Sequence, residues 1–356
     1  MEQTFYIGGY TDQDSEGIIR VRADFDRGIM EQEAGWSGIG NPSYLLLHPN
    51  GKILYAVNEY SPDGGLSAFR LEGGQLMKVA ELPTEGADPC HLSLDDTGHF
   101  LFVANYTSGS LVVFRLDKDG IPTEMSDHLQ HAGHGPNPQR QEGPHVHFSL
   151  SHEGELYVTD LGTDEIYRYR LNEETGRLSE SGPRLRLPAG NGPRHLAFSP
   201  KDGKILYVLC EMASELCVMR RNGGDYALVQ RISTLPDGLR EAERESSTAA
   251  AIRISADGNY LFTSNRGEDS IAIYRVKEGG EVTFLGTERT GRIPRDFLPA
   301  GRLAGTPWEE SFLLVAEQED RQVEVLRWNE KAETLEPTGM MVKTGMRPSC
   351  IQYYYA

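Results

Sequence analysis

Apolar and polar residues alternate in short runs along the whole chain, and these runs recur as a long repeat. The stretch NPSYLLLHPNGKILYAVNEY (41–60) has similar stretches at 88–107, 143–162, 192–211 and 247–266, and a weaker copy at 293–318. Successive copies begin 45 to 56 residues apart when they are aligned at Pro42, Pro89, Pro144, Pro193, Ala249 and Pro294. A repeat of this length predicts the blades of a β-propeller, each made of four short strands.

Within one copy, the pattern predicts four strands, which we name A to D in chain order. Strand A alternates apolar and polar residues and ends in a tight turn such as Asn50-Gly51 or Asp257-Gly258. An Asx-Gly pair between two apolar runs is a strong hairpin signal, so strand B is expected to pair with strand A. Two more short strands follow, such as GSLVVFRL (109–116) or DSIAIYRV (269–276).

The two ends of the chain provide one more blade. Residues 4–11 have the pattern of a strand B and residues 16–24 that of a strand C, whereas residues 346–355 have that of a strand A with nothing after it. Pairing of these ends predicts an all-β fold, a seven-bladed β-propeller of four-stranded antiparallel blades that forms a single domain over residues 1–356. A β-sandwich and two smaller barrels are the alternatives. Residues 239–245 predict one exposed helical turn.

Charge and composition narrow the range of partners. The formal net charge of −18 argues against nucleic acid, and it means that an anionic ligand needs arginines placed close to it. The N-terminus lacks the basic start of a signal peptide and no apolar run has the length of a transmembrane helix, so we expect a cytoplasmic protein without a membrane partner. We interpret the four cysteines as reduced core residues: Cys90, Cys210, Cys217 and Cys350.

Polar residues are expected to gather at one end of the blades. A hairpin brings the start of strand A beside the end of strand B, so these positions share one mouth of the central channel. Imidazole, guanidinium, carboxylate and amide groups occupy them: His145, His147, Arg194, His195 and Arg295 on A strands, and Glu59, Asn105, Glu211 and Arg266 near the ends of B strands. Such convergence favours a binding site. The alternative for each residue is a structural role, as a loop carboxylate or a tie between blades.

A histidine-rich segment, residues 126–147, precedes the third full copy of the repeat. His145 and His147 alternate with apolar residues, so we expect them to point to one face of a strand. The segment suggests zinc, with His134, His145 and His147 as ligands, but its spacing matches no standard zinc pattern. We favour a stiffened loop over the channel mouth that carries Arg140 toward an anion, and we expect no metal or organic cofactor.

Several stretches resemble one family, the seven-bladed propeller lactonases, which include bacterial 6-phosphogluconolactonases and fungal carboxymuconate cyclases. The most specific are GPNPQRQEGPHVHF, LYVTDLGTDEIYRY, GPRHLAFSP, AIRISADGNYLFTSNRGEDSIAIY and RPSCIQ, and the resemblance covers essentially the whole chain. It implies site residues at His147 or His145, Arg194, Glu211 and Arg266, to which the motif PRDF adds Arg295. Two departures from the family pattern are Cys210, where relatives often have Asn, and a third A strand that is one residue shorter.

The resemblance implies hydrolysis of a sugar-acid lactone, with 6-phosphogluconolactone of the pentose phosphate pathway as the expected substrate. Our hypothesis is that His147 and Glu211 act as a pair on water, with Glu211 either orienting the imidazole or taking the proton itself, while Arg194 and Arg266 stabilise the oxyanion. The substrate-binding residues would be His145, Arg295, His195, Glu59, Asn105 and Arg140. A muconate-type cycloisomerase and a non-catalytic binding platform are the alternatives. We expect a small anionic sugar lactone as the ligand, and a monomer or weak homodimer.

Overall fold

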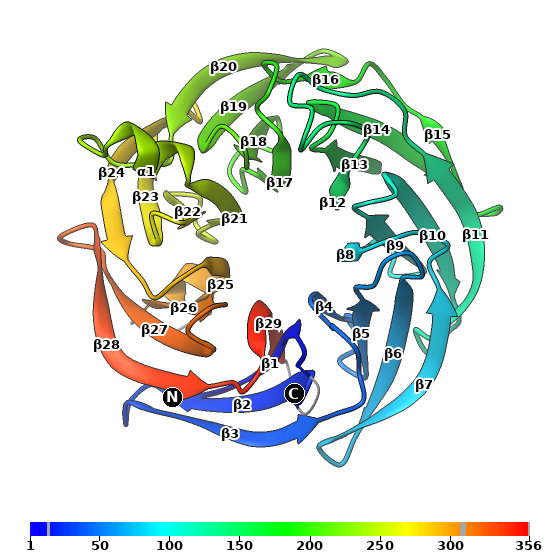
Figure 1. Cartoon of the computed structure of the whole chain (residues 1–356), viewed down its shortest axis with the longest axis horizontal. Coiled ribbons are helices and arrows are strands. Elements are labelled where there is room, and N and C mark those ends of the chain that lie inside the picture. The colour runs from blue at the N-terminus through cyan, green and yellow to red at the C-terminus, as the bar shows by residue number, and fades with distance from the viewer. Residues whose placement is uncertain (13–14, 307–310, 355–356) are drawn as a thin grey trace. The chain divides into compact units, whose positions relative to one another are not determined.

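The chain forms seven sheets, and each has four strands in its main path (Figure 1). The computed structural model describes residues 1–12, 15–306 and 311–354. Six sheets each use one continuous stretch of sequence in the order A-B-C-D, and the remaining sheet has the order β29-β1-β2-β3. The C-terminal strand therefore takes the A position beside the N-terminal strands. The blade count and the closing pair that the sequence predicts for a seven-bladed β-propeller are confirmed.

The blades are numbered from the one that joins the chain ends, and their strands are given in the order A to D. Blade 1 has β29 (Arg347–Tyr354), β1 (Glu2–Tyr10), β2 (Ile18–Asp24) and β3 (Ile29–Trp36); blade 2 has β4 (Leu45–Leu47), β5 (Ile53–Asn58), β6 (Gly65–Glu72) and β7 (Gln75–Pro83); blade 3 has β8 (Pro89–Leu94), β9 (Phe100–Asn105), β10 (Ser110–Leu116) and β11 (Pro122–Gln130). Blade 4 has β12 (Val146–His152), β13 (Glu155–Asp160), β14 (Glu165–Asn172) and β15 (Arg177–Glu180), with β16 (Leu185–Arg186) also paired to β14.

The remaining strands complete three further blades. Blade 5 has β17 (Pro193–Phe198), β18 (Ile205–Cys210), β19 (Glu215–Asn222) and β20 (Asp225–Ser233); blade 6 has β21 (Thr248–Ile254), β22 (Tyr260–Arg266), β23 (Ser270–Val276) and β24 (Val282–Arg289); blade 7 has β25 (Pro294–Gly301), β26 (Ser311–Glu317), β27 (Gln322–Asn329) and β28 (Thr334–Lys343). The predicted helical turn is α1 (Glu241–Glu245), and a 3-10 turn spans Arg302–Ala304. Within the residues that the structure describes, no helix is long and apolar enough to cross a membrane.

The chain divides into two compact units. One contains Met1–Ile7, Ile19–Ala34 and Arg194–Ile351, and the other contains Gly8–Ile18, Gly35–Pro193 and Gln352–Ala356. Each unit has its own apolar clusters, for example around Tyr207 in the first and around Tyr55 in the second. That residues 1–356 form a single domain stays a prediction.

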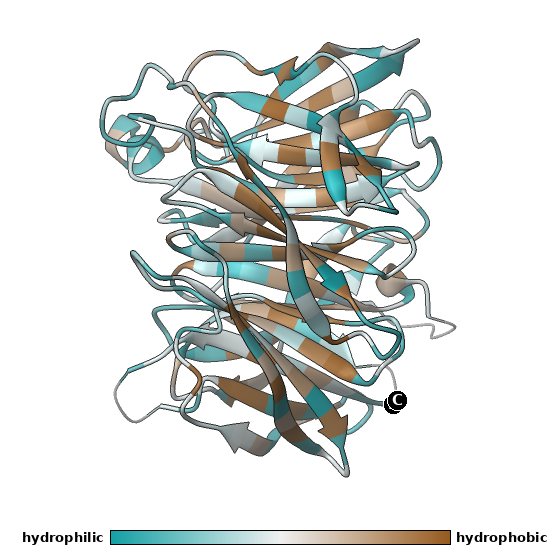
Figure 2. Cartoon of the chain, turned by 90° about the vertical axis from the view of Figure 1, so that its right-hand side faces the viewer, coloured by the Kyte–Doolittle hydropathy of each residue, from teal (hydrophilic) through white to brown (hydrophobic). Residues whose placement is uncertain are grey.

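Burial follows the order of the strands within a blade. The B strands β5, β9, β13 and β18 are buried at every residue, whereas the D strands β7, β11 and β20 are largely exposed or half-buried. Figure 2 shows apolar and polar segments alternating along single strands, as expected where only one face of a strand packs against a core. The buried B strands place their last residues at a defined end of each blade.

Among the described strands, the A strand β21 has a register irregularity between Ala249 and Ile252, and three further A strands have a β-bulge close to their start. The extra residue is Cys90 in β8, His147 in β12 and Arg295 in β25, because two residues of the A strand there face one residue of the B strand. A bulge re-aims the side chain that it carries, and bulges are common beside active sites. Two of these three residues are predicted site residues.

Candidate active site

The first group of site residues surrounds the carboxylate of Glu211. Its Oε2 atom lies 3.0 Å from Nε of Arg194 and 2.8 Å from Nη2 of Arg266. Glu211 is 4% exposed and Arg194 is 3% exposed, so this ion-pair cluster is shielded from water. Buried charges are stable only when they are paired and hydrogen-bonded. The cluster is therefore a built feature of the fold and not an incidental surface contact.

The strand order explains why these three residues meet. Arg194 lies at the start of β17, and Glu211 directly follows β18, the strand that pairs with β17. Arg266 ends β22 in the next blade, and the backbone N–H of Ala249 in that blade donates to the carbonyl of Glu211. The prediction that the start of strand A lies beside the end of strand B is confirmed here.

The partners of the two arginines orient their guanidinium groups. Arg266 also donates to the carbonyl of Ala249 at 3.0 Å, and Arg194 donates to the carbonyl of Ala250. Nη1 of Arg194 lies 3.0 Å from Nε2 of His195, which must accept the hydrogen bond because guanidinium nitrogens only donate. His195 thus helps to hold Arg194 in place, and its contact with substrate stays a prediction.

The charges around Glu211 decide what its carboxylate does best. A proton added to this carboxylate would weaken its attraction to two neighbouring cations, and in a buried site that attraction is large. Glu211 is therefore better suited to orienting Arg194 and Arg266 than to accepting a proton. The sequence leaves two roles open for Glu211, orienting the imidazole of His147 or accepting the proton. The ion pairs favour a third role, orientation of the two arginines.

The second group is centred on Tyr106, at the start of the turn after β9. The ring of His145 stacks on the ring of Tyr106, with centroids 4.7 Å apart, and its Nδ1 donates to the carbonyl of Tyr106 at 3.1 Å. The ring of His147 meets the same tyrosine edge-on at 5.7 Å, and Nη2 of Arg140 lies 3.2 Å from the tyrosine hydroxyl. Tyr106 thus gathers three predicted site residues, a role that our sequence reasoning missed. The signal for Tyr106 in the sequence is that it directly follows a strand B, as Glu59 and Glu211 do.

The local geometry of the two histidines corrects one expectation. Because His147 is the extra residue of the bulge in β12, the simple alternation that would place His145 and His147 on one face is interrupted. His145 precedes the strand, which begins at Val146. Both side chains are nonetheless buried, at 6% exposure each. Their common neighbour is Tyr106, and it is this contact that brings them together.

The side chains of two other predicted site residues form hydrogen bonds with neighbouring groups of the protein. The amide of Asn105, which is 0% exposed, donates to the carbonyl of Thr84 and to Ser110. The side chain therefore ties turns of its own blade together, and its predicted contact with substrate stays a prediction. The half-buried carboxylate of Glu59 accepts hydrogen bonds from the hydroxyls of Tyr10 and Ser43.

Comparison with known proteins identifies the family of the chain. The model of the family described as "Lactonase, 7-bladed beta-propeller" matches residues 4–353. The chain belongs to this lactonase family. A 6-phosphogluconolactonase from Bacillus subtilis is 34% identical over 89% of this chain and 91% of its own length.

Solved structures of similar proteins also carry names of lactonases. The structure of a putative 6-phosphogluconolactonase from Bacteroides fragilis has a TM-score of 0.88 at 30% identity and covers 99% of this chain and 98% of its own chain. A periplasmic gluconolactonase from Pseudomonas aeruginosa has a TM-score of 0.89 at 28% identity and covers 100% of this chain and 99% of its own chain. The resemblance that the sequence motifs indicate is thus confirmed at the level of the family.

The histidine-rich segment is engaged in protein contacts. His131 is buried against Asp160, His145 is bound to Tyr106, and His134 is exposed in the loop. Within the described part of the chain, no group of three or more His, Cys, Asp or Glu side chains is placed to hold a metal ion.

We expect exhaustive treatment with a chelator to leave the lactonase activity and the melting temperature unchanged. The reason is that the histidines of the segment are held by carboxylate, carbonyl and aromatic partners. The measurement is the rate of lactone hydrolysis and a thermal melt before and after dialysis against a chelator. Loss of activity that added zinc restores would contradict this prediction and would make His134, His145 and His147 the candidate ligands.

Proposed function

We propose that this lactonase hydrolyses 6-phosphogluconolactone to 6-phosphogluconate without a metal ion. The observation that carries the proposal is the buried cluster in which Glu211 holds two arginines in fixed orientation. Hydrolysis of an ester develops negative charge on the carbonyl oxygen, and preorganised cationic donors stabilise that charge. Relatives named for 6-phosphogluconolactone and for gluconolactone support a sugar-acid lactone as the substrate class.

Each step of the reaction has a proposed residue. His147 takes a proton from water as the oxygen of that water adds to the lactone carbonyl carbon. The family resemblance implies that Arg194 and Arg266 stabilise the oxyanion that forms. Collapse of this intermediate breaks the bond to the ring oxygen, which takes up the proton, and the new carboxylic acid ionises and releases one proton to the solvent. The bulge at His147 supports this role, because it gives that side chain a direction that a regular strand would not.

The test is a proton-release assay on freshly prepared 6-phosphogluconolactone, corrected for spontaneous hydrolysis. We expect a rate well above the uncatalysed one, and a product heavier than the substrate by one water molecule. A product of unchanged mass would indicate an isomerase. An uncatalysed rate with every lactone tested would indicate a binding protein. Faster hydrolysis of the unphosphorylated gluconolactone would retain the lactonase activity and reject the phosphorylated substrate.

Replacing Arg295 by alanine is expected to raise KM for 6-phosphogluconolactone more than KM for unphosphorylated gluconolactone. The net charge of −18 repels an anion, so a phosphate needs a nearby guanidinium, and the bulge in β25 re-aims this one. The measurement is KM for both lactones with both proteins. Equal changes for the two substrates would show that Arg295 does not contact the phosphate. Arg302→Ala, which removes an exposed arginine from the turn after β25, is the matched control.

A further inference from the structure

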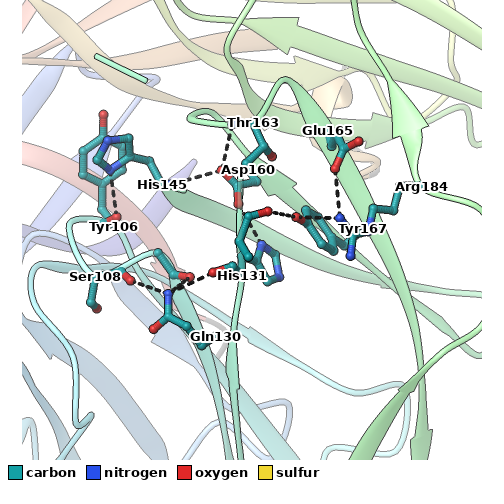
Figure 3. A network of polar contacts seen from close by, with 12 residues as sticks. Tyr106, Ser108, Gln130, His131, His145, Asp160, Thr163, Glu165, Tyr167 and Arg184 are labelled. Carbon is teal, nitrogen blue, oxygen red and sulfur yellow. Dashed lines mark hydrogen bonds and ion pairs between the residues drawn. The ribbon is translucent and has the colours of Figure 1, made fainter. Parts of the chain in front are cut away.

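The connection between β11 and β12, residues 131–145, is held at both ends by one carboxylate (Figure 3). Asp160, the last residue of β13, accepts the backbone N–H of His145 at 2.8 Å on Oδ1 and lies 2.8 Å from Nδ1 of His131 on Oδ2. Its Oδ1 also accepts the backbone N–H of Thr163 at 3.1 Å. The first and last residues of the loop are therefore fixed to the same side chain.

Burial makes these hydrogen bonds costly to break. Asp160 is 0% exposed and His131 is 4% exposed, so neither group can exchange its partner for water without opening the structure. A buried carboxylate is tolerated only while its oxygens are hydrogen-bonded. Asp160 therefore imposes one position on His131, His145 and Thr163 together, and any movement of the loop ends would carry a large penalty.

The surroundings of His131 on the side away from Asp160 argue against a catalytic role for the Asp160–His131 pair. Nε2 of His131 lies 3.0 Å from the hydroxyl of Tyr169, which gives the Asp-His-hydroxyl order of a nucleophile triad. However, burial raises the pKa of Tyr169, and it raises the pKa of Tyr167 to about 12. The ring of Tyr167 stacks on the ring of His131, with centroids 3.7 Å apart. Both phenols are also enclosed, because Tyr167 is 1% exposed and Tyr169 is 4% exposed, so neither hydroxyl is open to a substrate. The Asp160–His131 pair is a support and not a reacting group.

Hydrogen bonds within the loop make it rigid between its fixed ends. Gln141 accepts the backbone N–H of Asn137 through its side chain and donates to the carbonyl of Leu161 at 2.9 Å. The loop then presents Arg140 and His145 to the hydroxyl and ring of Tyr106. Since both are proposed substrate-binding residues, the position of the loop determines whether they reach a substrate.

We propose that Asp160, supported by His131, is the positioning residue that holds loop 131–145 in its substrate-binding arrangement. The inference rests on the proposed function for the roles of His145 and Arg140. The hydrogen-bond pattern that carries it is independent of that function. Asp160 acts through the backbone of His145, and its removal would leave the catalytic groups of the lactonase in place but misplace the groups that bind the substrate.

The experiment compares Asp160→Ala with Glu155→Ala, a matched control at the opposite end of the same strand. Glu155 is also a buried carboxylate, bound to Arg168 at 2.9 Å and to Ser181 at 2.7 Å. Hydrogen exchange by mass spectrometry is measured over residues 131–145. We expect faster exchange in this loop for Asp160→Ala and wild-type exchange there for Glu155→Ala. Unchanged exchange in the Asp160 variant would overturn the proposal, whatever the enzyme turns out to hydrolyse.

Kinetics supply the second measurement. We expect Asp160→Ala to raise KM for 6-phosphogluconolactone about 10-fold while changing kcat little, and Asp160→Asn, which keeps an acceptor for the N–H of His145, to recover most of that loss. The double variant Asp160→Ala, His145→Ala should raise KM no more than the single variant with the larger effect. Additive costs would overturn the proposal, because Asp160 would then act independently of His145.

A variant that changes less of the site keeps the test decisive if Asp160→Ala does not fold. His131→Phe preserves an aromatic ring against Tyr167 but removes the hydrogen bond to Asp160. We expect faster exchange near the start of the loop and a rise in KM smaller than that of Asp160→Ala. Wild-type exchange in a folded His131→Phe protein would show that His131 does not support Asp160.

Discussion

Replacing His147 by alanine is expected to lower kcat for lactone hydrolysis about 100-fold or more, the range for loss of a general base. His145→Ala is the matched control, because both side chains are equally buried and both contact Tyr106. Since Nδ1 of His145 is committed to the carbonyl of Tyr106, we expect that variant to act mainly on KM. The measurement is kcat and KM for each variant at several pH values.

The same series includes Glu211→Gln. A neutral amide cannot balance the guanidinium groups of Arg194 and Arg266, so the oxyanion donors would lose their orientation and kcat should fall about as far as in His147→Ala. If His147 and Glu211 serve one chemical step, the double variant should be little worse than either single one. A crippling effect of His145→Ala with an active His147→Ala would reverse the assignment of the base.

Deleting residues 346–356 is expected to abolish cooperative thermal unfolding. The deletion removes β29, the A strand of blade 1, and leaves one edge of β1 without its partner. An exposed strand edge in an apolar setting favours association with other chains. The deletion also removes the backbone N–H of Ile351, which donates at 3.1 Å to Asp296, a buried carboxylate that Arg253 binds on its other oxygen.

Two controls distinguish the loss of β29 from blade 1 from a simple loss of apolar contacts. Ile351→Ala removes apolar contact but keeps β29, so it should lower the melting temperature and leave a single cooperative transition, as large-to-small core changes do. A synthetic peptide of residues 346–356 added to the truncated protein should restore part of the transition by filling the empty strand position. Wild-type melting of the truncated protein would contradict the closure.

Much of the candidate site follows from the hairpin pattern in the sequence. The start of strand A and the end of strand B must lie together in an antiparallel pair, so the repeat alone is enough to place Arg194 and Glu211 side by side. The same rule locates Asn105 along its blade without showing that its side chain is covered, so its substrate contact stays a prediction. Burial of that side chain depends on neighbouring turns that the repeat does not specify.

The repeat by itself determined the all-β fold, the number of blades and the use of the C-terminal strand in blade 1. These features depend on the period of two within a strand, on turn residues such as Asn50-Gly51, and on the count of strands at the chain ends, all of which are local properties of the sequence. Only the tertiary structure decided the bulge at His147 and the attachment of loop 131–145 to Asp160. A bulge is a choice of hydrogen-bond register between strands, and the buried carboxylate joins segments far apart in sequence, so both arise from packing that no local pattern records.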